Sequence, residues 1–315
     1  MSAVKITEGI YSVGIMNPNM RVFDIVMKTD SGTSYNSYLV RGSEKTALIE
    51  TCHESFFEEY LENIKEVCKF EEIDYIVMNH NEPDHSGSLA KLLELMPNAQ
   101  LIASIAGANY LKNITNRCDL DIHKVKDGEV LDLGGLSLTF LSAPNLHWPD
   151  TMYTYIEEEQ ILVTCDSFGS HYGFDDVLLS KVTDWEGYMR ATKYYYDNII
   201  GPFKPFMLKA LERVRELDIS MICTGHGPVI DDKIDFILNT YEEWSTVVNP
   251  NPKKTVIMPY VSAYGYTKSL AEKIAEGIRA SGDIDVRAYD MVEADQAKVL
   301  EELGFADGIL FGSPT

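Results

Sequence analysis

The chain has 315 residues and carries 27 Lys and Arg against 49 Asp and Glu, a formal net charge of −22. Such a charge repels phosphate backbones and anionic membrane surfaces, so we expect no nucleic-acid partner and no membrane partner. No apolar run approaches the roughly 20 residues of a membrane span, and the N-terminus lacks the pattern of a leader peptide. Five scattered cysteines predict neither a disulfide framework nor a Cys-x-x-Cys metal site. We expect a cytoplasmic protein.

The first 250 residues predict short strands followed by alternating helices and strands. Strands separated by turn residues between Ile6 and Glu50 indicate an antiparallel sheet. Apolar residues at helical spacing from Phe57 to Val67 then lead into a strand that ends at Met78. Later helices are expected over 185–200, 206–217 and 231–244.

The segment Asn249-Pro250-Asn251-Pro252 has the composition of a linker, because its two prolines can neither continue a helix nor donate to a strand ladder. We therefore expect one domain over residues 1–249 and a second over 250–315. The second domain reads as strand, turn, helix and two further strands, which indicates a parallel α/β unit.

Four of the seven histidines share one context, because each follows an apolar strand in a loop with Pro or Gly. The stretch M-N-H-N-E-P-D-H-S-G-S adds two carboxylates, and another aspartate directly follows a strand. Residues at strand ends converge at one edge of a sheet, and grouped buried carboxylates are tolerated mainly when paired or metal-bound. The pattern predicts one metal site, with candidate ligands His80, Glu82, Asp84, His85, His147, Asp166 and His226.

The remaining histidines are weaker candidates. A single histidine after a strand is more often a structural hydrogen-bonding residue than a ligand. His171 lies five residues beyond Asp166 and either lines a substrate pocket, as a proton or hydrogen-bond donor, or lies in a solvent-facing loop. His53 and His123 lie among charged residues and are expected to be structural.

The pattern H-x-E-x-D-H from His80 to His85, with His147, Asp166 and His226 downstream, resembles the flavodiiron proteins. The segments L-H-W-P-D-T-M, C-D-S-F-G-S-H and T-G-H-G-P carry the same resemblance. It implies an α/β fold, in which a metallo-β-lactamase-like αββα sandwich is followed by part of a flavodoxin-like parallel βαβ unit.

The resemblance also implies how the metals are held. One iron takes His80, Glu82 and His147, the other takes Asp84, His85 and His226, and Asp166 bridges them. In some family members water replaces the counterpart of His85, so this ligand is left open. Related zinc enzymes carry H-x-H-x-D-H, and the exchange of imidazole for the Glu82 carboxylate favours iron over a zinc hydrolase centre.

The loop S-A-Y-G-Y-T resembles the phosphate loop of flavodoxins, and a helix N-terminus after a strand favours a phosphate. The implied FMN-binding residues are Ser262, Tyr264, Gly265, Tyr266, Thr267, Pro314 and Thr315. A whole flavodoxin-like domain has two further strands, so we expect an open sheet edge and an exposed apolar face here, and binding of FMN depends on what covers them.

The resemblance implies reduction of dioxygen to water or of nitric oxide to nitrous oxide, with electrons delivered through FMN. It implies a head-to-tail homodimer or a dimer of dimers, and an external donor such as rubredoxin, a deazaflavin or an NAD(P)H-linked reductase. Two alternatives stay open, namely a metal-dependent hydrolase of the same fold and a diiron sensor of gas or redox state.

Overall fold

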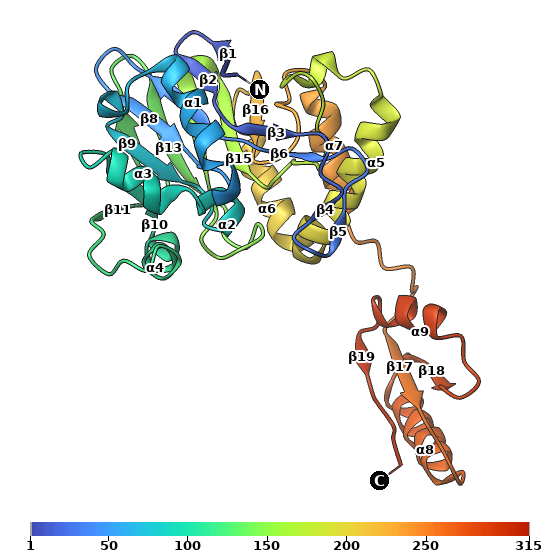
Figure 1. The fold of residues 1–315 in the computed structure, drawn as a ribbon. Helices are drawn as coiled ribbons and strands as arrows, with labels where there is room; N and C mark the ends of the chain where they lie inside the picture. The colour runs from blue at the N-terminus through green and yellow to red at the C-terminus, as the bar shows by residue number, and fades with distance from the viewer. Residues whose placement is uncertain (1, 315) are drawn as a thin grey trace. The chain divides into compact units, whose positions relative to one another are not determined.

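The computed structural model describes residues 2–314, which divide into two compact units (Figure 1). The larger unit extends to Thr246 and the smaller unit begins at Val247. The smaller unit thus begins two residues before the expected linker, which starts at Asn249. None of the helices in the described part of the chain has the length and apolar composition needed to cross a bilayer.

The larger unit contains a seven-stranded sheet and a five-stranded sheet. The first sheet comprises, in spatial order, β1 (Val4–Thr7), β2 (Ile10–Ser12), β7 (Tyr38–Arg41), β8 (Thr46–Ile49), β9 (Tyr75–Met78), β10 (Gln100–Ser104) and β11 (Ile122–Val125). The second comprises β12 (Val130–Asp132), β13 (Ser137–Ser142), β14 (Met152–Ile156), β15 (Ile161–Cys165) and β16 (Met221–Thr224). Two small ribbons pair β3 (Ile15–Asn17) with β6 (Thr33–Tyr35), and β4 (Val22–Phe23) with β5 (Met27–Lys28).

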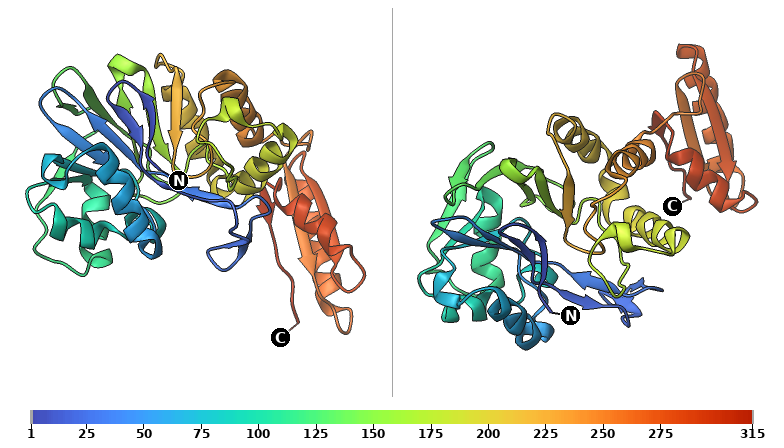
Figure 2. Two further views of the ribbon diagram at one scale, coloured as in Figure 1. Left: turned by 45° about the horizontal axis from the view of Figure 1, so that its top comes forward. Right: turned by 90° about the horizontal axis from the view of Figure 1, so that it is seen from above.

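Helices cover the outer faces of these sheets (Figure 1; Figure 2). The α-helices of the larger unit are α1 (Phe57–Val67), α2 (Pro83–Ser86), α3 (Leu89–Leu95), α4 (Ile105–Ile114), α5 (Trp185–Tyr195), α6 (Lys204–Val214) and α7 (Ile234–Ser245). A π-helical turn, η5 (Tyr196–Ile200), extends α5. Short 3-10 turns are η1 (Glu54–Phe56), η2 (Phe70–Glu72), η3 (Glu157–Glu159), η4 (Leu179–Lys181) and η6 (Gly201–Phe203).

The alternation of side chains along the strands explains the layers. On β8, Ala47 and Ile49 pack between the two sheets, whereas Leu48 packs under the helices on the other face. On β15, Val163 faces the inter-sheet core and Leu162 faces the layer of α5, α6 and α7. Because successive residues of a strand point to opposite faces, strands buried on both faces produce an αββα sandwich. The mixed α/β fold class expected from the sequence is confirmed.

The smaller unit is a three-stranded parallel sheet in the order β18-β17-β19. Its elements are β17 (Thr255–Tyr260), α8 (Tyr266–Ser281), β18 (Asp285–Asp290), α9 (Gln296–Leu303) and β19 (Gly308–Ile309). Its core is small, and Leu270, Leu300 and Phe311 remain 61%, 69% and 78% exposed. The expected open edge and exposed apolar side chains are therefore present.

Three local expectations needed revision. The helix expected over 185–200 leaves α geometry after Tyr195, where η5 begins. The last strand is confined to Gly308–Ile309, and beyond it the chain still follows β17, with an isolated bridge between Gly312 and Tyr260. The parallel α/β unit implied a helix before the last strand but gave no range for it; this helix is α9, whose N-cap Asp295 accepts hydrogen bonds from the main-chain N–H groups of Ala297 and Lys298.

Candidate metal centre

The loop after β9 and the short helix that follows it carry four of the candidate ligands within six residues. His80 directly precedes a turn into α2, and Pro83 occupies the first position of this helix, where a missing N–H costs nothing. Asp84 and His85 follow on α2, and both are buried. His147, Asp166 and His226 come from loops next to β13, β15 and β16. Both sheets of the sandwich thus contribute.

The first group of side chains consists of His80, Glu82, His147 and Asp166, whose donor atoms all lie within 4.8 Å of one another. Glu82 Oε2 lies 2.9 Å from His147 Nε2 and 3.3 Å from His80 Nε2. Asp166 Oδ2 lies 3.3 Å from each of the same two nitrogens. Two imidazoles and two carboxylates therefore point at one position.

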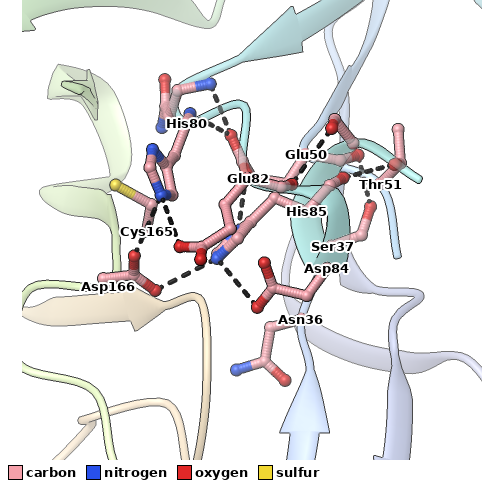
Figure 3. Close-up of polar contacts among 12 residues, drawn as sticks. Asn36, Ser37, Glu50, Thr51, His80, Glu82, Asp84, His85, Cys165 and Asp166 are labelled. Atoms are coloured by element: carbon pink, nitrogen blue, oxygen red, sulfur yellow. Dashed lines mark hydrogen bonds and ion pairs between the residues drawn. The ribbon is translucent and has the colours of Figure 1, made fainter. Parts of the chain in front are cut away.

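The second group consists of Asp84, His85 and His226. Asp84 Oδ2 lies 3.0 Å from His226 Nε2 and 3.6 Å from His85 Nε2. Asp166 reaches this group with its other oxygen, since Oδ1 lies 3.1 Å from His85 Nε2 (Figure 3). The same oxygen lies 3.5 Å from His226 Nε2. Gly225 is required here, because a Cβ at this position would lie 2.7 Å from the His85 ring.

The donor set fits two cations better than it fits an internal ion-pair network. All four histidines approach through Nε2, and the donor atoms are spaced as expected for ligands about 2.0–2.2 Å from a shared metal, which lie about 3 Å apart. Asp84 Oδ1 and Asp166 Oδ2 are buried without a hydrogen-bond partner in the described structure. Buried carboxylates in that state are stabilised by metal coordination.

In the metal-free cluster, protons on the histidines balance the negative charge of the carboxylates. Burial disfavours a charged imidazole, but hydrogen bonds to Asp150 and Glu82 raise the pKa of His80 to about 10. For His147, burial is outweighed in the same way by Asp166 and Glu82, and the pKa rises to about 9. Burial would raise the pKa of Asp166, yet the neighbouring histidines hold it well below its ordinary value. The cluster attracts cations.

Polar groups that are not themselves candidate ligands contact the ligand side chains and orient them. The Nδ1 of His226 donates to the carbonyl oxygen of Ser34 at 2.6 Å, which leaves Nε2 free to coordinate. His80 Nδ1 lies 3.4 Å from Asp150 Oδ2. Tyr195 donates its hydroxyl hydrogen to Asp166 Oδ1 at 3.0 Å. The sequence analysis missed Asp150, although it follows His147 in the motif H-W-P-D, and nothing marked Tyr195 within its helix.

His171 is buried beside the second group, so a solvent-facing position is wrong. Its ring lies 5.4 Å from the ring of His226 and 4.2 Å from that of Phe23, and Nδ1 lies 2.9 Å from Thr33 Oγ1. Burial lowers the pKa of His171 to about 3, so this imidazole is neutral. His171 lines a cavity of about 300 Å³ together with Lys28, Thr29, Asp30, Ser31, Gly187, Arg190, Ala191 and Tyr194.

The expected flavin residues lie in the smaller unit. Gly265 caps α8 with a φ of 83°, a left-handed conformation that favours glycine. Ser262 Oγ accepts a hydrogen bond from the main-chain N–H of Lys268, while Tyr264 and Tyr266 are 89% and 83% exposed. A helix N-terminus flanked by exposed aromatic rings suits a phosphate and a flat ring system. Thr267 is the second residue of α8, Pro314 lies five residues beyond the end of β19, and Thr315 lies outside the described residues.

Comparison with known proteins defines the class of this site. A family model described as ODP family beta lactamase matches residues 33–227. The chain is 44% identical to the flavo-diiron protein FprA2 of Clostridium acetobutylicum, over all of this chain and 79% of that protein. It is 36% identical to the type A flavoprotein fprA of Rhodobacter capsulatus, over 99% of this chain and 72% of that protein.

Solved structures agree with this assignment. The flavodiiron protein of Giardia intestinalis aligns with a TM-score of 0.75 at 31% identity, covering all of this chain and 76% of that one. Rubredoxin oxygen:oxidoreductase of Desulfovibrio gigas aligns with a TM-score of 0.75 at 30% identity, covering all of this chain and 78% of that one. The larger unit thus has a metallo-β-lactamase-like fold. The chain belongs to the flavodiiron protein family, whose members are diiron flavoprotein oxidoreductases.

Proposed function

We propose that this chain reduces dioxygen to water, nitric oxide to nitrous oxide, or both, at a diiron centre supplied with electrons through FMN. His80, Glu82 and His147 hold one iron, and Asp84, His85 and His226 hold the other. Asp166 bridges the two. Iron held by these residues would supply electrons for reduction of the diatomic substrate, and FMN would pass electrons to the centre singly.

The observation that carries the proposal is the arrangement around Asp166. One of its oxygens faces His80 and His147, and the other faces His85 and His226, so a single carboxylate serves two neighbouring cation positions. Glu82 adds a carboxylate where zinc enzymes of this fold carry an imidazole, and a harder donor set favours iron.

Residues beyond the ligands shape the approach of substrate. His171 lines a cavity large enough for a small molecule, and its ring lies 5.4 Å from the ring of His226, a candidate ligand of the second metal. His171 Nε2 is buried without a hydrogen-bond partner in the described structure. A neutral imidazole held at Nδ1 by Thr33 has Nε2 left over for a hydrogen bond to a small molecule, and at neutral pH it does not act as an acid.

The flavin, donor and assembly complete the proposal. The loop from Ser262 to Thr267 holds the FMN phosphate, and an external rubredoxin, deazaflavin or nicotinamide-linked reductase supplies electrons. A head-to-tail dimer brings the flavin of one copy to the irons of another. A cytoplasmic location fits the five cysteines, which are all free, because disulfides are rare in reducing compartments.

Metal, flavin and turnover measurements test the proposal together. Purified protein should carry two irons per chain, and the reduced donor should drive consumption of dioxygen or nitric oxide at a steady rate. Two zincs with esterase or thioesterase activity would instead identify a hydrolase. Stoichiometric binding of the gas without turnover, at full flavin occupancy, would identify a sensor.

A further inference from the structure

Glu50 is a buried carboxylate that neither the ligand set nor the flavin loop uses. It directly follows β8, is 1% exposed, and adopts a φ of 61°, which is uncommon for a residue other than glycine. Its main chain is fixed as well, because its N–H donates to Val77 O, and the Ser37 hydroxyl donates to Glu50 O at 2.9 Å. Such a strained, fully supported position indicates a function.

The Glu50 carboxylate connects the two groups of ligands (Figure 3). Oε1 accepts hydrogen bonds from the main-chain N–H groups of Asn79 and of His80, the latter at 3.0 Å. Oε2 lies 2.8 Å from His85 Nδ1, an ion-pair contact, and has no hydrogen-bond partner in the described part of the chain. One side chain therefore holds the backbone beside a ligand of the first group and the ring of a ligand of the second.

The contact at Nδ1 determines how His85 is presented. A carboxylate this close to Nδ1 favours the tautomer that carries its hydrogen on Nδ1, so the lone pair is left on Nε2. His85 Nε2 points at Asp166 Oδ1 and Asp84 Oδ2, at 3.1 and 3.6 Å. The main chain of His85 is held too, since its carbonyl oxygen accepts a hydrogen bond from the N–H of Thr51 at 3.0 Å.

We infer that Glu50 is a positioning residue that locks His85 as a ligand of the second metal. The inference rests on the proposed function and decides a point that the resemblance left open. Without the carboxylate, the His85 ring can turn or change tautomer, and water can take its place. Outer partners of this kind change metal affinity by about 10- to 100-fold.

The test compares Glu50→Gln with wild type and with Glu243→Gln, which makes the same charge change at an exposed site. Chelator-treated protein is titrated anaerobically with Fe(II) against a chromophoric chelator. We expect Glu50→Gln to bind its second iron about 10- to 100-fold more weakly, with little change at the first, because the amide oxygen still accepts from Asn79 and His80. If Glu50→Gln binds both irons as tightly as wild type, the inference about Glu50 is overturned. If wild type itself lacks two iron-binding sites, the proposed function is overturned.

A double variant separates action through His85 from a general effect on the loop. In a His85→Ala background, Glu50→Gln should cause no further loss of second-metal affinity. An equal loss in both backgrounds overturns the inference. If Glu50→Gln does not fold, NMR spectra of zinc-loaded wild type labelled with ¹⁵N-histidine test the inference instead. His85 should show a protonated Nδ1 and a metal-shifted Nε2, and a protonated Nε2 contradicts the assignment.

Discussion

The two units of this chain prepare their sites in different ways. In the larger unit, the seven candidate metal ligands are buried or nearly buried and already point at two positions, supported by Glu50, Asp150 and Tyr195. In the smaller unit, the loop that suits a flavin is open, and Tyr264 and Tyr266 are largely exposed. A packed core fixes donor directions before a metal binds, whereas side chains on an exposed loop are held by few contacts.

The largest expected effect comes from Asp166→Asn, which changes the carboxylate shared by the two groups of candidate metal ligands. Asp166 faces four histidines, and asparagine keeps its shape but loses the charge. We expect metal content to fall from two per chain to less than one and turnover to fall more than about 100-fold, beyond the loss typical of outer partners. Metal analysis checks this against the exposed control Asp119→Asn. Retention of both metals by Asp166→Asn would show that the Asp166 carboxylate is not needed to hold them.

Glu82→His tests whether the carboxylate sets the choice of metal. The variant restores the H-x-H-x-D-H pattern, and a softer donor set favours zinc. After chelation and exposure to equal Fe(II) and Zn(II), its bound zinc-to-iron ratio should rise about tenfold over wild type. Glu82→Asp serves as the control, because it keeps the carboxylate. An unchanged ratio in Glu82→His would mean that Glu82 does not govern selectivity.

Metal removal should destabilise the larger unit in a pH-dependent way. Metal present at about 1,000 times its dissociation constant contributes about 4 kcal/mol, so chelation should lower Tm by about 10 °C. In metal-free protein the pKa values of His80 and His147 are raised to about 10 and about 9, so their stabilisation is complete below about pH 6.5 and declines as pH rises toward these values.

Calorimetric scans of metal-free and metal-loaded protein between pH 6.5 and 9 check this sign. The metal-free Tm should fall across this range, and the difference between the two forms should widen, because protons compete less with the metal. A difference that narrows as pH rises would contradict the proposed histidine ligands.

The candidate metal ligands could be predicted from the sequence, but most of the residues that hold these ligands in place could not. Strand ends followed by His, Asp and Glu marked every candidate ligand, because chain direction alone brings such ends to one edge of a sheet. The same signal was available for Glu50, which follows the strand ending at Ile49, but a lone glutamate there has no distinctive neighbours. Tyr195 lies within a helix, and only tertiary packing places its hydroxyl beside Asp166. The burial of His171 likewise depends on Phe23, nearly 150 positions away in the chain.

The smallest expected effect on the metal centre is that of cutting between the units. Val247 and Val248 are 58% and 75% exposed and follow the end of α7, so thermolysin should cleave the full chain there first. The larger fragment should keep both metals, since all seven ligands lie before Thr246, while the smaller, open unit should be digested further. Mass analysis of the fragments, with metal analysis of the larger one, checks both points. Release of metal on cleavage would show that the larger unit does not organise its centre alone.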